Sequence, residues 1–143
     1  QARGAPPWID LDAEKRLHQV CLTAAQERVL RSAHDVADGG LAVAVAESAI
    51  LGQHGADVGL EPSPARPEAQ LFGEGQSRAV VSVAPEQLAR VLDAAASAGV
   101  RAQRIGRVGG GRVRFGDWID LSLEEVAEAW EQGLELAAAE LPS

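Results

Sequence analysis

Apolar residues recur along the chain at spacings that predict four helices. The first begins at about residue 12, with a second at 41–52 that is Ala-rich, almost uncharged and therefore expected to be buried. A third follows Pro85 and stops at Gly99. Ser122 and Glu125 form a capping box for the last helix. The residues expected to face inward are Leu17, Val20, Cys21, Ala24 and Ala25 in the first helix, and Val126, Ala129, Trp130 and Leu134 in the last.

Short segments rich in β-branched residues separate these helices. Strands are predicted at 29–34, 55–60 and 78–83, while 61–67 holds three prolines and predicts a loop. Segments 100–108 and 112–115 flank Gly109–Gly111, whose turn chemistry predicts a hairpin. The order α-β-α-β-β-α-β-β-α predicts an α+β fold, with helices packed on a mixed or antiparallel sheet.

The length of 143 residues is that of a single domain. Residues 1–9, which include several Gly, Pro and small polar residues, predict a linker, and 10–143 predict one domain. The chain starts at Gln1 and contains no Met, so we expect a fragment of a longer chain whose other parts complete its function.

Charge and cysteine content exclude several classes of partner. The net charge of −8 argues against a nucleic-acid partner held by attraction to phosphates. No uncharged stretch approaches the roughly 20 residues of a membrane helix, so no membrane contact is expected. Cys21 is the single cysteine and forms no internal disulfide, which fits a reducing cytoplasm. We expect it to be a buried small hydrophobic residue rather than a nucleophile.

The first candidate site lies just before the second helix. Asp35 and Asp38 precede Gly39 and Gly40, which open that helix. The start of a helix attracts anions, and glycine allows a phosphate to approach the backbone, so these residues are candidates for nucleotide or phosphate binding. The acidic pair can also hold Mg²⁺ or a ribose hydroxyl. Alternatively, Asp38 is only an N-cap and the glycines only a tight turn.

The second candidate site precedes the strand at 78–83. Glu74, Gln76 and Arg78 alternate there, so on an extended strand they share one face and can hydrogen-bond a polar ligand. Together with Ser77 they form a candidate substrate-like cleft. The alternative is a solvated sheet face.

Five arginines form a third cluster near the glycine run. One interpretation is a surface that binds an anion or a protein partner. The more ordinary interpretation is the solvent-exposed face of a hairpin. The histidines have no Cys or His partner at metal-binding spacing, so no metal site is expected. The arginines are Arg101, Arg104, Arg107, Arg112 and Arg114.

Two of these segments resemble a known family. Residues 32–47, SAHDVADGGLAVAVAE, resemble the signature of the last domain of phosphoribosylformylglycinamidine synthase, and 71–78, LFGEGQSR, are similar to its second signature. Segments 105–108 and 121–130 fit the tail of that domain, and the resemblance extends over nearly the whole chain from Pro6. It implies a fold like the C-terminal domain of AIR synthase. Related domains occur in aminoimidazole ribonucleotide synthetase and selenophosphate synthetase, which remain alternatives, as does a non-catalytic partner-binding module.

The resemblance also implies a function. The family enzyme is a cytoplasmic ligase of purine biosynthesis that uses ATP, Mg²⁺ and glutamine-derived ammonia to convert formylglycinamide ribonucleotide to its amidine. Its partners are the remaining domains of the same chain, a glutaminase subunit and a small accessory subunit. This chain resembles the second of two related halves, whose cleft is degenerate and structural. Glu74, Gly75 and Gln76 stand where the first half has a substrate-binding Glu-Ser-Gln. The resemblance therefore implies no catalytic residue here, no certain cofactor for this domain and no activity of the domain alone.

Overall fold

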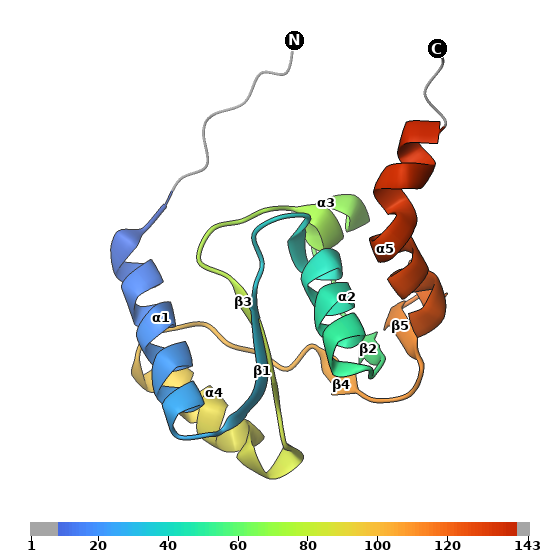
Figure 1. Cartoon of the computed structure of the whole chain (residues 1–143). Coiled ribbons are helices and arrows are strands. Elements are labelled where there is room, and N and C mark those ends of the chain that lie inside the picture. The colour runs from blue at the N-terminus through green and yellow to red at the C-terminus, as the bar shows by residue number, and fades with distance from the viewer. Residues whose placement is uncertain (1–8, 140–143) are drawn as a thin grey trace. The chain divides into compact units, whose positions relative to one another are not determined.

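A computed structural model describes residues 9–139, with side chains described for 9–133. Residues 1–8 of the predicted linker lie outside the described residues. Helices and strands are mixed along the chain in an α+β fold (Figure 1), which confirms the predicted class. The elements are α1 (Leu11–Gln26), β1 (Leu30–Asp35), α2 (Gly40–Gly52), β2 (Ala56–Val58), α3 (Pro67–Phe72), β3 (Ala79–Val83), the 3-10 turn η1 (Pro85–Gln87), α4 (Leu88–Ser97), β4 (Gly106–Val108), β5 (Arg112–Phe115), β6 (Ile119–Ser122) and α5 (Leu123–Ala139).

The chain divides into two compact units, and the boundary falls within α2. The first unit comprises Gln1–Ala44 and Pro64–Arg104, and the second comprises Val45–Ser63 and Ile105–Ser143. Each unit contains one sheet, of two strands in the first and four in the second.

The first unit is built on the antiparallel pair of β1 and β3. Its register runs from Leu30 opposite Val83 to Asp35 opposite Ala79. Helices α1 and α4 lie side by side next to this pair (Figure 1). The side chain of Asp10 caps α1 by accepting hydrogen bonds from two backbone N–H groups. The buried apolar side chains of this unit are Ala24, Val29, Val36, Leu41, Ala42, Ala44, Leu71 and Ala95.

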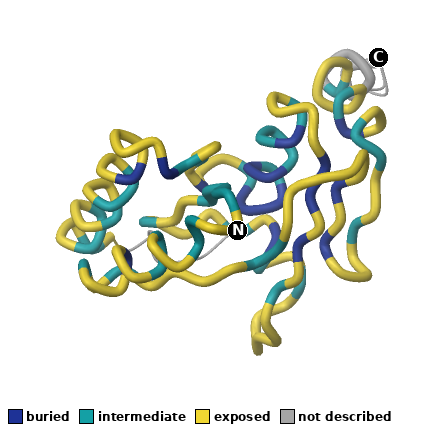
Figure 2. Tube along the Cα trace, turned by 90° about the horizontal axis from the view of Figure 1, so that it is seen from below, coloured by how far each residue is buried: buried dark blue, intermediate teal, exposed yellow. Residues whose placement is uncertain are grey.

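The second unit contains a mixed sheet in the order β4-β2-β5-β6. Strand β2 is antiparallel to β4 and parallel to β5, and β6 is antiparallel to β5. The two inner strands, β2 and β5, alternate between buried and exposed positions (Figure 2). The buried face carries Ala56, Val58, Val113 and Phe115, so the sheet has one apolar face and one charged face.

The predicted hairpin around Gly109–Gly111 is wrong, because β2 lies between β4 and β5. The glycine run instead passes the start of β2. The N–H of Gly55 donates to the carbonyl of Gly110 at 2.8 Å, and the N–H of Gly109 donates to the carbonyl of Gly55 at 2.8 Å. The turn chemistry was identified correctly, but the partner strand comes from fifty residues earlier, which a local pattern does not reveal.

The capping box of α5 is confirmed, but the predicted inward face is only partly correct. Val126 is 9% exposed, whereas Trp130 is 60% exposed and Ala129 is also exposed. Residues 126, 129 and 130 share one face of the helix. The described residues cover this face at Val126 and leave it in contact with water one turn later, at Ala129 and Trp130. The side chain of Leu134 lies outside the described residues.

The first helix shows a similar, smaller departure from the expected stripe. Ala24 is buried and Leu17, Val20 and Cys21 are half-buried, but Ala25 is exposed. The short helix α3 was not predicted, because Pro67 was assigned to the preceding loop. The proline instead occupies the first turn of α3, where its missing N–H costs nothing.

We predict that Trp130 contributes little to stability. Trp130→Ala should lower the free energy of unfolding by less than about 1 kcal/mol, because most of the indole is already in contact with water. Phe115→Ala should lower it by roughly 3–5 kcal/mol, because this ring is 1% exposed and its removal leaves a cavity. Denaturant unfolding of the two variants measures both values. Equal losses would contradict the exposed position of Trp130.

Candidate functional site

A cleft of about 450 Å³ lies within the first unit. Its volume is in the range of small-molecule sites, roughly 300–1,000 Å³. Two segments line it, 33–38 and 74–79, together with Glu14, Leu17, His18 and Cys21 on one face of α1. The fold therefore brings the two candidate sites of the sequence together. Asp35 and Asp38 line the same cleft as Glu74, Gln76, Ser77 and Arg78.

The turn from β1 into α2 depends on its two glycines. Gly39 and Gly40 have φ angles of 74° and 75°, a left-handed conformation that other residues adopt at a cost. A Cβ atom on Gly40 would lie 2.6 Å from the backbone carbonyl carbon of Phe72, at the end of α3. A side chain at Gly40 would therefore disturb the packing of α3 whether or not an anion binds nearby.

Glu74 connects the two candidate segments directly. The N–H of Gly39 donates to Oε1 of Glu74 at 2.9 Å. A carboxylate is favourable beside the start of a helix, where free N–H groups and the helix dipole carry positive charge. The backbone amide proposed as an anion site is thus bonded to a carboxylate of the same chain, a role for Glu74 that the sequence did not reveal.

The expected extended row of Glu74, Gln76 and Arg78 is wrong. Residues 73–78 form a loop, and Ser77 has a φ of 57°. The pairing of β1 with β3 begins only at Asp35 opposite Ala79, so the residues before it have no partner strand. The loop closes on itself, with Nη1 of Arg78 donating to the carbonyl of Gly73 at 3.1 Å. Its end is held by the N–H of Val36, which donates to the carbonyl of Arg78 at 3.0 Å.

Two further polar residues of the cleft, Glu14 and His18, were missed. The hydroxyl of Ser77 donates to Oε2 of Glu14. Nε2 of His18 lies 2.8 Å from Oε1 of the same carboxylate. The available signal was spacing, because 14, 17, 18 and 21 share one face of a helix.

The cleft is acidic, with little nucleophilic character. Four carboxylates and one guanidinium line it, beside two histidines. Burial raises the pKa of the Cys21 thiol, so the reactive thiolate is disfavoured. Among the residues that the structure describes, no three His, Cys, Asp or Glu side chains are grouped so that they could hold a metal ion. Mg²⁺ would therefore need ligands from nucleotide phosphates or from elsewhere.

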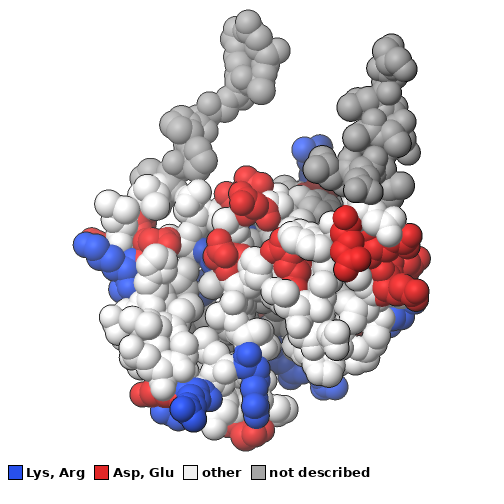
Figure 3. Space-filling model, in the orientation of Figure 1, with Lys and Arg blue, Asp and Glu red and all other residues white. Residues whose placement is uncertain are grey.

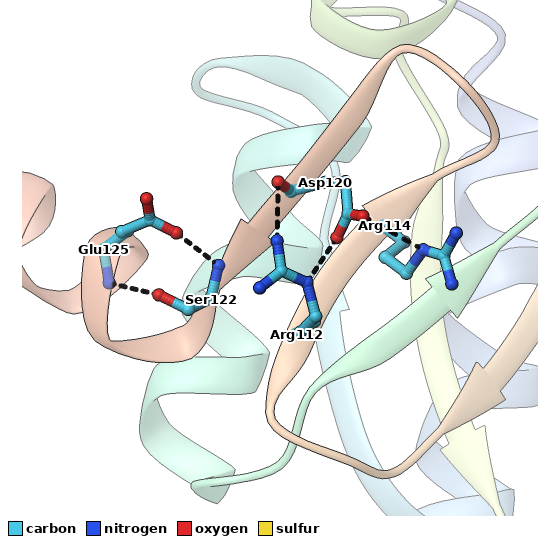
Figure 4. A network of polar contacts seen from close by, with 5 residues as sticks. All are labelled: Arg112, Arg114, Asp120, Ser122 and Glu125. Atoms are coloured by element: carbon cyan, nitrogen blue, oxygen red, sulfur yellow. Dashed lines mark hydrogen bonds and ion pairs between the residues drawn. The ribbon is translucent and has the colours of Figure 1, made fainter.

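The five clustered arginines are divided between the units, with Arg107, Arg112 and Arg114 in the second. Within the second unit, two of them pair with an acidic residue of the same sheet. Asp120 accepts hydrogen bonds from Nε of Arg112 at 2.5 Å, through its carboxylate, and from Nη2 at 3.0 Å, through its backbone carbonyl. Nε of Arg114 lies 3.7 Å from the other carboxylate oxygen (Figure 4). Acidic side chains also gather over the first turn of α5 (Figure 3). Positive and negative side chains are thus interspersed, as on an ordinary solvent-exposed face of a sheet.

The same network fixes the start of α5. The N–H of Ser122 donates to Oε2 of Glu125 at 2.7 Å, and the N–H of Glu125 donates to Oγ of Ser122 at 3.1 Å (Figure 4). The backbone hydrogen bond from Ser122 lowers the pKa of Glu125. The hydrogen bond from Arg112 lowers the pKa of Asp120.

In the part of the chain that the structure describes, no helix is long and apolar enough to span a membrane. The fold and the cleft define an α+β protein that carries a polar, acidic cavity of small-molecule size. Residues 2–118 match the family described as AIR synthase related protein, C-terminal domain. The chain belongs to this family, as the two signature segments indicated.

Curated relatives are similar over almost all of the chain. The phosphoribosylformylglycinamidine synthase subunit PurL of Moorella thermoacetica is 44% identical over 140 residues, which cover 95% of this chain and 19% of that protein. The subunit of the same name from Anaeromyxobacter sp. (strain K) is 39% identical over 140 residues, covering 92% and 18%. The chain thus spans about a fifth of the length of these relatives.

Solved structures from Thermotoga maritima share the fold. Phosphoribosylformylglycinamidine synthase II superposes with a TM-score of 0.73 at 26% identity, over 85% of this chain and 22% of that one. PurL complexed with ATP gives a TM-score of 0.71 at 26% identity, over 83% and 22%. PurLQS gives 0.74 at 24% identity, over 83% and 22%, which supports the fold alone.

We predict that the contact between Asp120 and Arg112 stabilises the protein only above the acidic range. The folded pKa of Asp120 is lowered, so its contribution is complete above the unfolded pKa and is lost as the pH falls through the folded pKa. Asp120→Asn should therefore lower the free energy of unfolding at about pH 7 and make little difference at about pH 2. Urea unfolding at the two values measures this. In an Arg112→Gln background the pH dependence of the difference should largely disappear, and its persistence would contradict the assignment.

Proposed function

We propose that this chain is the C-terminal domain of a phosphoribosylformylglycinamidine synthase subunit. The whole enzyme would be an ATP-dependent carbon–nitrogen ligase of purine biosynthesis, which converts formylglycinamide ribonucleotide to its amidine with ammonia from glutamine. The observation that carries this proposal is the 44% identity to such a subunit over 95% of the chain. The relatives named above are all synthase subunits, which favours this function over aminoimidazole ribonucleotide synthetase or selenophosphate synthetase.

Within that enzyme the chain forms a ligand cleft and supplies no catalytic residue. Asp35 and Asp38 would face the phosphates of a nucleotide, while Gly39 and Gly40 shape the turn beside them. The 74–78 loop would bind the polar remainder of the nucleotide. Because carboxylates outnumber the single guanidinium of Arg78, phosphates would be repelled unless a cation accompanied them. We therefore expect ATP to enter with Mg²⁺, whose charge would offset that of Asp38 and the phosphates. A T. maritima relative of the same fold has been solved with ATP.

The protein partners would be the remaining domains of the same chain, a glutaminase subunit and a small accessory subunit. The curated relatives named above are themselves subunits of a synthase, which supports the presence of partner subunits. Residues 10–143 would act as one domain of that chain, in the cytoplasm.

The activity is tested on the full-length protein that carries this chain. With formylglycinamide ribonucleotide, ATP, Mg²⁺ and ammonia it should produce the amidine and ADP, whereas residues 1–143 alone should give no turnover above a blank. Product formation is followed by mass spectrometry. A folded full-length protein that makes no amidine, or turnover by the chain alone, would contradict the proposal.

The cleft is tested by a charge-neutral substitution. Asp38→Asn should weaken Mg²⁺-dependent ATP binding roughly 10-fold or more, because it removes a carboxylate that offsets the charge of the cation. Asp93→Asn is the matched control, since Asp93 is exposed on α4 and does not line the cleft. Calorimetric titration of the full-length protein measures both. Equal affinities for the two variants would show that the nucleotide does not contact this turn.

A further inference from the structure

We infer that Glu14 is a positioning residue, which holds the 73–78 loop so that Glu74 reaches the start of α2. Glu14 lies on α1, more than fifty residues before the loop, and belongs to neither signature segment. Its effect on the loop follows from the contacts described below. Its effect on ligand binding rests on the proposed function.

Both oxygens of the Glu14 carboxylate are engaged. Oε2 accepts the hydrogen bond from the hydroxyl of Ser77, and Oε1 lies 2.8 Å from Nε2 of His18 one turn further along α1. The side chain of Glu14 is 26% exposed, against 72% for His18. The carboxylate is therefore oriented towards the loop, with the histidine on its solvent side.

The loop needs such an anchor, because regular structure fixes only its two ends. It leaves α3 at Gly73 and joins β3 at Ala79, and between these points no strand pairs with it. Ser77 adopts a left-handed conformation that is uncommon for a residue with a side chain. The hydrogen bond to Glu14 holds Ser77 in this conformation and ties the loop to α1.

The position of Ser77 in turn determines that of Glu74. The two residues are three positions apart in the same loop, and Glu74 reaches across to the N–H of Gly39. Releasing Ser77 from Glu14 should therefore weaken the bond between Glu74 and Gly39. Glu14 acts through Ser77 and need not touch a ligand itself.

The test compares Glu14→Ala, Ser77→Ala, the double variant and Glu14→Gln in the full-length protein. Hydrogen exchange of the Gly39 amide reports the contact with Glu74. Each alanine variant should accelerate this exchange roughly 5- to 10-fold. The double variant should exchange no faster than either single variant, because all three remove the same hydrogen bond between Ser77 and Glu14. Glu14→Gln should stay close to the parent, since its amide oxygen still accepts from Ser77.

Two controls separate positioning from general destabilisation. Asp12→Ala changes an exposed carboxylate of the same helix and should leave the Gly39 amide unchanged. The amide of Ala95, in the buried face of α4, should exchange at the parent rate in every variant. Unchanged exchange at Gly39 in Glu14→Ala, or equal acceleration at Ala95, would overturn the inference.

Binding of ATP with Mg²⁺ to the same proteins connects the anchor to the cleft. Glu14→Ala and Ser77→Ala should weaken binding together, and Glu14→Gln should restore it. If Glu14→Gln binds as weakly as Glu14→Ala while the Gly39 amide stays protected, the carboxylate is itself a ligand contact and positioning is refuted. If the parent protein binds no ATP, the proposed role of the cleft fails, and the exchange at Gly39 still decides the role of Glu14.

Discussion

The candidate site depends on the left-handed backbone at Gly39 and Gly40. Gly39 ends the turn of residues 36–39 that joins β1 to α2, and Gly40 begins the helix, where its missing side chain lets the end of α3 approach. A residue with a Cβ would pay roughly 1–2 kcal/mol for the conformation alone. Because α3 ends against Gly40, the loop that follows α3 begins beside the start of α2. Glu74, which belongs to this loop, can therefore accept the hydrogen bond from the N–H of Gly39. The same two glycines thus shape the turn and bring the second signature to the first.

Small side chains allow this close packing in the first unit. Its buried positions are mainly alanines and valines, and the fully buried large ring, Phe115, belongs to the other unit. With little bulk to exclude water, the cleft of the first unit is shaped by backbone proximity and by polar contacts such as Ser77 to Glu14. Four carboxylates line this cleft, and under the proposed function they favour a ligand that arrives with a cation.

The sequence predicts the elements of this fold better than it predicts their partners. Helices α1, α2, α4 and α5 were found from periodicity and caps, since these signals are local. The predicted hairpin at Gly109–Gly111 is wrong because β2, which comes from a distant part of the sequence, lies between β4 and β5. The prediction that Trp130 is buried was wrong because periodicity gives the direction of a side chain but not whether other residues cover it. Glu14 was missed for a related reason, because its partner Ser77 lies sixty-three residues away.

The two signature segments were identified from sequence, yet their chemistry in the structure is not what alternation along a strand suggested. Glu74 is bonded to the amide of Gly39, so this carboxylate stabilises the fold whichever ligand enters the cleft. Under the proposed function, a phosphate directed at Gly39 would have to displace Glu74 or bind beside it. The negative charge of Glu74 would then make an accompanying cation a condition of phosphate binding.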